Sequence, residues 1–386
     1  MTRLDSVQAL RGIAALAVML CHLVAIEAGH AGRDAPLTDF FDNGAYGVDL
    51  FFVISGFIMV WVAGSVPRGL VSAGDFLYAR VTRIYPLWWL FAGAMVVFLL
   101  LFRGLPWDAD RLDPKELDGV THLIKSFLLW PQPEHPVLGV GWTLVHEMYF
   151  YIGFTLLILF LPQRWRLPGI LTWGGVVFIG ALAGLGTSFG RNLVELVFSP
   201  VTLEFVFGAM VAYMIQAGWR RFARTSIIAG CIGLLIGFLL VDNQTGGTLL
   251  APLELERPAY FLMMWGRVFI FGIPAALVLY GVVALELQSK LTRSLPKPLV
   301  DIGDWSYALY LCHMLTISAV GKIVYMVFGT DSVIATPVYF VTAIALSLLV
   351  AALSYKWFER PLIKYFRRWR RTPQPKATGT VNAPAE

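Results

Sequence analysis

The chain has 386 residues, of which 58% are apolar and only 14% are charged, about half the charged share of an ordinary soluble protein. Its mean hydropathy is +0.69. These values exclude a soluble, a disordered or a nucleic-acid-binding chain and indicate a protein that lies largely within a lipid bilayer. The net charge of +5 then raises the question of which side of the bilayer the basic residues occupy.

Ten apolar runs are long enough to cross a bilayer as helices, since about 17–25 residues suffice. They lie approximately at residues 9–27, 44–64, 84–102, 142–162, 168–187, 193–216, 226–242, 260–285, 304–327 and 333–357. The expected fold class is an all-α integral membrane protein with about ten transmembrane helices. Residues 1–361 are predicted to form the transmembrane domain and residues 362–386 a basic, then disordered, tail.

The distribution of basic residues predicts that the N-terminus and the C-terminus are both cytoplasmic. In this orientation the inner loops and the C-terminal segment hold 21 of the 30 Lys and Arg residues, and the outer loops hold seven. Such an imbalance is what the positive-inside rule describes. The longest outer loop, about residues 103–141, is interpreted either as a cap over a site or as a solvated connector.

Ionisable residues inside the predicted spans are candidate site residues, because placing such groups in lipid is costly. Arg11 and His22 share one face of the first helix, about 16 Å apart along its axis. Asp49 and Glu147 are predicted a few residues below the outer surface, in the same layer as His22. A histidine beside carboxylates suits general-base catalysis, and a polar cluster that only joins helices fits the same pattern.

Further polar residues lie in other spans. Arg80 and Arg83, near the start of the third span, are three residues apart and so share a helix face. Such a pair either binds a phosphate in bidentate fashion or simply extends toward lipid headgroups. His313 is predicted near mid-membrane, and Glu204 and Arg267 are predicted to neutralise each other at similar depth.

Neither a metal site nor a disulfide is predicted. All three cysteines lie in apolar runs. Cys21 precedes His22 and Cys312 precedes His313, but adjacent residues on a helix point about 100° apart and do not converge on one ion.

Six short motifs follow one another along these spans. They are Arg11-x10-His22, Gly47-Val-Asp-Leu-Phe-Phe-Val-Ile-Ser-Gly-Phe57, Arg80-x-x-Arg83 with Tyr85-Pro86, Trp142-Thr-Leu with Glu147, Ser306-Tyr-Ala-Leu-Tyr-Leu-x-His313, and Glu359-Arg-Pro361. In this order, within ten spans, they resemble the acyltransferase 3 family of integral-membrane acyltransferases, and within it the exopolysaccharide O-acetyltransferases. The resemblance covers residues 4–361.

The resemblance implies an enzyme of the bacterial inner membrane that transfers acetyl from cytoplasmic acetyl-CoA to a carbohydrate hydroxyl. The acceptor would be an exported or surface polysaccharide or its lipid-linked precursor. A carbohydrate and the lipid bilayer are therefore the expected partners, and nucleic acid is not. The oligomeric state is left open.

The resemblance also implies roles for individual residues. The phosphate end of CoA would be bound by Arg11, Arg80 and Arg83, and the pantetheine arm would pass His313. His22 would be the catalytic histidine, with supporting carboxylates from Glu147 and Asp49. Two routes remain open, because His22 either removes the proton from the sugar hydroxyl or is itself acetylated and then deacylated by the sugar.

Two other classes of protein fit ten spans with embedded charges. A secondary transporter of a small or carbohydrate substrate typically has recognisable repeat halves and paired helices broken by Gly or Pro, and neither is evident here. A structural scaffold for polysaccharide export would leave the embedded His, Asp and Glu residues unexplained.

Overall fold

The structure is a computed structural model that describes residues 3–31, 43–102, 119–186, 190–240, 265–290, 295–330 and 332–370. Every regular element in these ranges is a helix. Nine helices in the described ranges are long and apolar enough to cross a membrane, and a shorter apolar helix covers residues 223–239. The prediction of an all-α, multi-pass membrane protein with about ten spans is confirmed.

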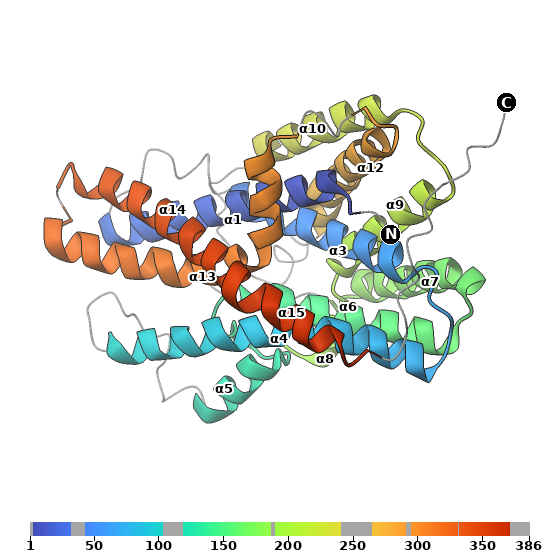
Figure 1. Cartoon of the computed structure of the whole chain (residues 1–386), viewed down its shortest axis with the longest axis horizontal. Helices are drawn as coiled ribbons and strands as arrows, with labels where there is room; N and C mark the ends of the chain where they lie inside the picture. Colours follow the sequence, from blue (N-terminus) through green and yellow to red (C-terminus); the bar gives the residue numbers. More distant parts are fainter. Residues whose placement is uncertain are drawn as a thin grey trace.

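The helices are arranged with their long axes mostly along the length of the molecule (Figure 1). In chain order they are α1 (Asp5–Ala31), the 3-10 turn η1 (Asn43–Tyr46), α3 (Gly47–Ala63), α4 (Leu70–Leu101), α5 (Gly119–Leu128), α6 (Gly141–Phe160), α7 (Gln163–Leu182), α8 (Leu193–Val197), α9 (Thr202–Gln216), α10 (Ala223–Leu240), the π-helical turn η3 (Val268–Gly272), α12 (Ile273–Leu287), α13 (Lys297–Phe328), α14 (Ala335–Ser354), the π-helical turn η4 (Tyr355–Glu359) and α15 (Arg360–Arg367).

Two helices extend well beyond their predicted spans. α4 and α13 have 32 residues each, which makes them about 48 Å long, whereas the hydrocarbon core of a bilayer is about 30 Å thick. Both helices begin before the predicted spans 84–102 and 304–327, because they continue through polar residues at their N-terminal ends. This extension makes Arg80 and Arg83 part of α4.

α1 and α13 lie side by side and parallel, with small residues between them. A Cβ atom on Gly303 would lie 1.9 Å from the carbonyl oxygen of Gln8, and one on Gly12 would lie 2.6 Å from that of Leu299. Small residues allow this close approach, which membrane helices use because packing must replace the hydrophobic effect between them. α14 and α4 also pack against α13.

A second group of helices packs around α3 and α9. A Cβ atom on Gly56 would lie 1.9 Å from the carbonyl oxygen of Phe205, and one on Gly208 would lie 1.8 Å from that of Val53. Phe52 contacts Phe205 at the start of the two helices and Val60 accepts from Gln216 near their ends, so α3 and α9 run parallel. α12 packs against α9 and α3, and α10 covers α12 at the upper edge of Figure 1.

The second half of the long connection before α6 is packed against the bundle. Residues 103–118 lie outside the described ranges, and α5 follows them. The indole Nε1 of Trp88 donates to the carbonyl of Ser126 (3.2 Å), and the hydroxyl of Ser126 accepts from Gln132 Nε2 (3.1 Å) and Val137 N (3.0 Å). Ser126, Gln132 and Val137 are thus held by hydrogen bonds within the protein, which differs from a solvated connector.

Candidate active site

A cavity with a volume of about 350 Å³ lies among α1, α3, α4, α6 and α13. That size is at the lower end of the roughly 300–1,000 Å³ typical of small-molecule sites. Its charged and phenolic lining comprises Arg11, Arg80, Arg83, Arg370, Glu147, Tyr151, Tyr307 and Tyr310. The cavity therefore joins the three predicted phosphate-binding arginines with one predicted catalytic carboxylate.

The arginines of the cavity are only partly neutralised by the protein. Arg83 and Arg11 interact electrostatically with Glu359, which is buried in the turn after α14. The guanidinium of Arg80 lies 5.7 Å from the ring centre of Tyr151, and its Nε is buried without a hydrogen-bond partner. An excess of positive charge of this kind favours an anionic ligand.

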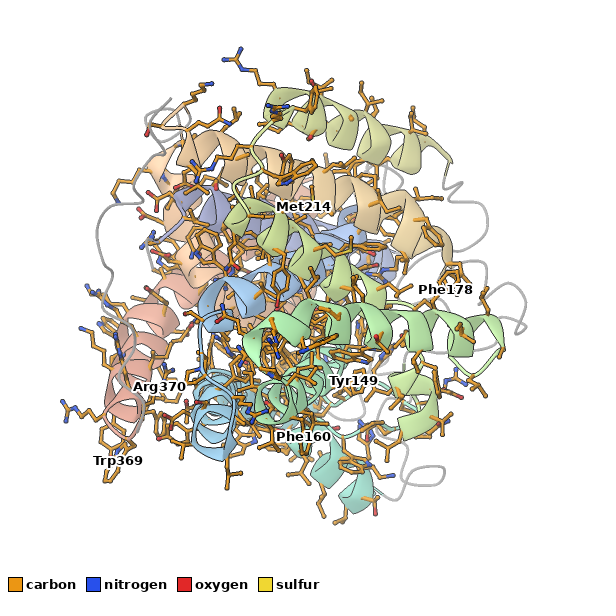
Figure 2. All side chains as sticks on the ribbon, turned by 90° about the vertical axis from the view of Figure 1, so that its right-hand side faces the viewer. Tyr149, Phe160, Phe178, Met214, Trp369 and Arg370 are labelled. Carbon is orange, nitrogen blue, oxygen red and sulfur yellow. The ribbon has the colours of Figure 1, made fainter. Side chains whose placement is uncertain are left out.

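The C-terminal end of α15 reaches the same cavity. Figure 2 shows Trp369 and Arg370 at this end, next to the start of α4. Phe366 packs edge-on against Tyr78 of α4, with ring centres 6.5 Å apart. Residues 362–370 of the predicted tail are thus packed on the transmembrane domain, whereas residues 371–386 lie outside the described ranges.

Glu147 lies on the wall of the cavity. Its Oε1 accepts hydrogen bonds from the hydroxyl of Ser55 (2.6 Å) and from the phenol of Tyr151. Tyr151 is four residues after Glu147, so both side chains point from the same face of α6. The three groups join α3 to α6 beside Arg80.

Tyr310 closes the opposite end of the cavity. Its hydroxyl donates to the carbonyl of Val140 (3.1 Å) and lies 2.9 Å from the hydroxyl of Thr143, at the start of α6. The ring of Tyr310 is 5.9 Å from that of His313, the next residue on this face of α13. The cavity thus ends directly in front of His313.

His22 and His313 form a contacting pair beyond Tyr310. Their ring centres are 5.1 Å apart, and His313 Nε2 lies 3.3 Å from His22 Nδ1. Each Nδ1 also lies near a carbonyl four residues earlier on its own helix, that of Val18 (2.9 Å) or Leu309 (3.0 Å). Because a carbonyl only accepts, we assign both rings as Nδ1–H tautomers, with His313 Nε2 accepting from His22. The basic nitrogen of His22 is then Nε2.

Glu147 and the histidine pair occupy different depths, which corrects the prediction of a common layer. Thr143 and Tyr310 are at one level, since their hydroxyls touch. Glu147 is four residues along α6 toward the arginines, and His313 is three residues along α13 in the opposite direction. At 1.5 Å per residue, Glu147 and His313 are separated by about 10 Å along the bundle.

Asp49 is engaged in a buried ion pair with Arg267. Its two carboxylate oxygens accept from Arg267 Nε (2.7 Å) and Nη2 (2.9 Å), and both side chains are almost fully buried. The guanidinium of Arg267 also lies 5.4 Å from the ring centre of Trp142. The hydrogen-bonded partner of Arg267 is therefore Asp49 and not the predicted Glu204, which lies next to the pair and interacts with Arg267 electrostatically.

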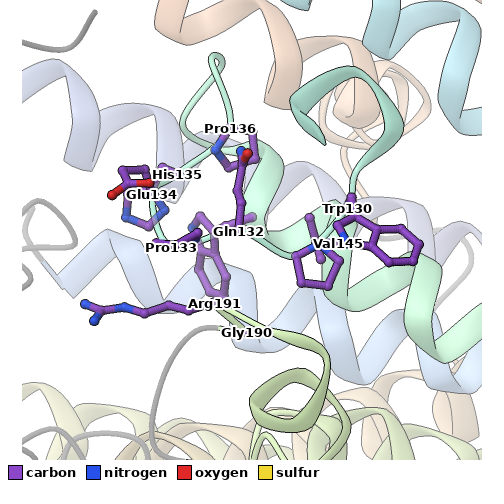
Figure 3. Close-up of a pocket in the computed structure, with 11 residues that line it drawn as sticks. Trp130, Gln132, Pro133, Glu134, His135, Pro136, Val145, Gly190 and Arg191 are labelled. Atoms are coloured by element: carbon purple, nitrogen blue, oxygen red, sulfur yellow. The ribbon is translucent and has the colours of Figure 1, made fainter. Parts of the chain in front are cut away.

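A second hollow lies between residues 130–136 and the segment Gly190-Arg191 (Figure 3). Its volume is about 20 Å³, which is room for about one water molecule. It is too small for a sugar ring. Among the described residues, no group of three or more His, Cys, Asp or Glu side chains is placed to hold a metal ion.

Comparison with known proteins shows the relationship of the chain to an acyltransferase family. The family model, described as an acyltransferase domain, matches residues 4–356. The chain belongs to this acyltransferase family. The match covers α1, α3, α4, α6 and α13, which form most of the arginine-lined cavity and carry the histidine pair, and it ends within η4, before α15.

Individual relatives of this acyltransferase share most of its length. The exopolysaccharide production protein ExoZ of Rhizobium meliloti is 32% identical over 86% of this chain and 93% of its own. The acyltransferase MdmB of Streptomyces mycarofaciens is 30% identical over 82% of this chain and 79% of its own. The O-acetyltransferase OatA of Staphylococcus aureus is 24% identical over 97% of this chain and 60% of its own. No solved structure matches the chain.

No role was predicted from the sequence for several residues that the structure places at the site, although most of them belong to the motifs quoted above. Ser55, Tyr310 and Glu359 are in motifs of the second span, the ninth span and the chain end. Tyr151 was detectable from its helical spacing to Glu147. Nothing in the sequence except the basic residues around it marked Arg370 as a site residue. Its approach to the cavity depends on the turn between α14 and α15.

Proposed function

We propose that this acyltransferase is an O-acetyltransferase of the bacterial inner membrane. It transfers acetyl from cytoplasmic acetyl-CoA to a hydroxyl of an exported or surface polysaccharide or its lipid-linked precursor. The observation that supports this most is a single path, in which an arginine-lined cavity leads through Tyr310 to a buried histidine pair. The relatives ExoZ and OatA, whose names refer to exopolysaccharide production and O-acetyl transfer, support the choice of acceptor and acyl group.

The arginines bind the phosphates of the donor in this proposal. CoA carries a pyrophosphate and a phosphomonoester, and guanidinium groups bind such oxygens with two parallel hydrogen bonds. Arg11 and Arg83 share Glu359, which holds their side chains in place without neutralising both. The arm of the donor then runs past Glu147 and Tyr310 toward His22, and the acetyl thioester passes the Tyr310 side chain to reach the histidine.

His22 acts through Nε2, and His313 supports it. As His22 Nε2 gains a proton, its Nδ1–H becomes a stronger donor, and His313 Nε2 accepts that hydrogen bond. From the sequence, this supporting role was assigned to the carboxylates of Glu147 and Asp49. We therefore assign His313 as a positioning residue, Glu147 as a residue that organises the cavity wall, and Asp49 as a partner of Arg267.

Two chemical routes use this arrangement. In the direct route, His22 Nε2 takes the proton of the sugar hydroxyl while its oxygen attacks the thioester carbonyl. The C–S bond then breaks, and the proton passes from His22 to the CoA thiolate. In the covalent route, Nε2 attacks the thioester carbonyl, the C–S bond breaks and CoA leaves as its thiolate. The sugar oxygen then attacks the acetyl group, the bond from Nε2 to the acetyl carbon breaks, and the hydroxyl proton passes to the thiolate. Mass spectrometry of the enzyme after incubation with acetyl-CoA alone distinguishes them, because only the covalent route adds an acetyl group.

The first test is the O-acetyl content of the surface glycan, measured by proton NMR in cells with the wild-type gene, no gene or His22→Ala. We expect an acetyl resonance to be lost in both deficient strains, because the base or nucleophile is missing. Unchanged acetylation in the strain without the gene would contradict the proposed function and favour a transporter.

A second variant tests the donor side. Arg83→Ala removes one phosphate contact but leaves His22 intact, so acetyl transfer should fall and recover in part at high acetyl-CoA concentration. Proteoliposomes containing the purified enzyme allow this measurement. Absence of any recovery at saturating acetyl-CoA would remove Arg83 from the donor site.

A further inference from the structure

The C-terminal segment after α14 contributes to the cavity of this enzyme. Ile363 and Arg370 line the cavity together with Arg80 and Arg83 of α4. The edge-on contact between Phe366 and Tyr78 holds α15 against α4. The segment that the sequence presents as a basic tail thus forms one wall of a binding cavity.

Arg370 is close to another arginine and incompletely neutralised. It repels Arg80 electrostatically, and Arg367 lies nearby as well. Asp75 of α4 is the acidic residue that attracts it. Burial and the charge of Arg367 lower the pKa of Arg370, and its Nε is buried without a hydrogen-bond partner. Two guanidinium groups held together in this way form a site for an anion of more than one negative charge.

The position of Arg370 along the cavity indicates which anion it meets. Its neighbours on α4 are Asp75, Tyr78 and Arg80, near the start of the helix. Trp88, further along α4, meets the start of α6 at Gly141, close to the level of Thr143 and Tyr310. About 10 residues of α4, or about 15 Å, therefore separate Arg370 from the end of the cavity that faces His22.

We propose that Arg370, together with Arg80, binds the ribose 3′-phosphate of CoA. This inference rests on the proposed function. The thioester must lie at the His22 end, so the group bound at the opposite end is the part of the donor most distant from the thioester, its 3′-phosphoadenosine. A phosphomonoester carries about −1.5 to −2 charges at pH 7, which matches two guanidinium groups. Arg11 and Arg83, deeper in the cavity, then meet the pyrophosphate.

The test compares two probes, CoA and 3′-dephospho-CoA, which differ only in this phosphate. Their dissociation constants are measured by isothermal titration calorimetry on the purified full chain in detergent. The wild-type enzyme should bind CoA about 10- to 100-fold more tightly than 3′-dephospho-CoA. Arg370→Ala should weaken CoA binding by a similar factor and leave 3′-dephospho-CoA binding unchanged.

Matched variants separate a specific contact from a general loss of charge. Arg368→Ala removes an equal charge from an exposed position two residues away, and should leave both dissociation constants unchanged. Arg370→Lys keeps the charge but not the paired hydrogen bonds, so it should give an intermediate loss for CoA alone.

Other outcomes overturn the inference in distinguishable ways. Equal weakening of both probes by Arg370→Ala would place Arg370 on the part common to the two molecules, and no weakening would remove it from the site. Equal binding of the two probes by the wild type would show that the 3′-phosphate is not recognised. Failure of the wild type to bind either probe would overturn the donor assignment under the proposed function and this inference with it.

Discussion

The buried charged residues of this protein form two groups, which differ in how completely neighbouring groups neutralise each charge. Asp49 and Arg267 form two hydrogen bonds with each other and are closed off from solvent. The four arginines of the cavity share three acidic partners, Glu147, Glu359 and Asp75, and keep an excess of positive charge. A fully paired group costs little to retain, whereas an incompletely paired set is costly unless a ligand completes it. This contrast indicates a structural role for the Asp49–Arg267 pair and supports the proposed ligand-binding role of the cavity arginines.

His313→Ala should lower the turnover number by about 10- to 100-fold and change KM for acetyl-CoA by less than about twofold. The reason is that His313 Nε2 accepts from His22 Nδ1 and supports the charge that forms on His22. Acetyl transfer in proteoliposomes, at varied acetyl-CoA, provides both constants. A role in binding the pantetheine arm predicts the reverse, a raised KM with turnover retained. His313→Gln should restore part of the activity, because its amide oxygen also accepts a hydrogen bond.

Asp49→Asn should lower stability by about 3–5 kcal/mol, because it removes the carboxylate that is hydrogen-bonded to the buried Arg267 charge. The thermal unfolding temperature in detergent measures this effect. The double variant Asp49→Leu with Arg267→Met removes both charges and should unfold at a higher temperature than the single variant. If the double variant were stably folded yet had lost turnover as completely as His22→Ala, Asp49 would belong to the catalytic machinery.

At the scale of elements, the pairing of α1 with α13 determines the geometry of the site. The two helices are parallel and in contact from Gln8 to His30 of α1, so a residue on one has a defined neighbour on the other. The backbone contact at Gly303 and the contact of His22 with His313 belong to the same interface. Glycine is required at position 303 because the carbonyl of Gln8 occupies the space of a Cβ atom.

Gly303→Ala should force α1 and α13 apart and lower stability by about 1–3 kcal/mol, with a loss of acetyl transfer. Its control is Gly93→Ala on α4, where a Cβ atom would meet nothing within 4 Å. Thermal unfolding and transfer activity of the two variants provide the comparison. Equal stability of both variants would show that the α1–α13 contact is not as close as described.

At the scale of the whole molecule, the helices place the arginines and the histidine pair toward opposite ends of the bundle. Glu147 and Tyr310 lie between these ends. If the arginine end faces the cytoplasm, as the positive-inside rule predicts, acetyl-CoA enters from the inside and the acceptor hydroxyl meets His22 nearer the outside. The helical bundle would then transfer an acetyl group across most of the membrane thickness, while CoA itself does not cross.

This orientation predicts the accessibility of two engineered cysteines in a chain whose three native cysteines are replaced by serine. Ser332→Cys, between α13 and α14, should react with a membrane-impermeant maleimide in intact spheroplasts, because it lies on the predicted outer side. Arg368→Cys should react only after the membrane is permeabilised. The opposite labelling pattern would invert the topology and place the donor cavity on the wrong side for cytoplasmic acetyl-CoA.

The sequence by itself determined the class of the protein, because apolar runs of bilayer length form helices wherever they are folded. It also identified His22, Arg11, Arg80 and Arg83 as candidates, since charged and polar groups inside such runs are costly. The order of the six motifs was sufficient to predict the acyltransferase family, which the family model confirms. Spacing further placed Arg11 and His22 on one helix face.

Only the tertiary structure decided which polar groups meet. A position along a span predicts depth, but contact also requires a helix rotation and a neighbour, and these are properties of packing. Asp49 therefore binds Arg267, His22 contacts His313, and Glu147 lies about 10 Å nearer the arginines than predicted. Arg370 reaches the cavity because α15 folds back on α4, an arrangement held by contacts between residues almost 300 positions apart.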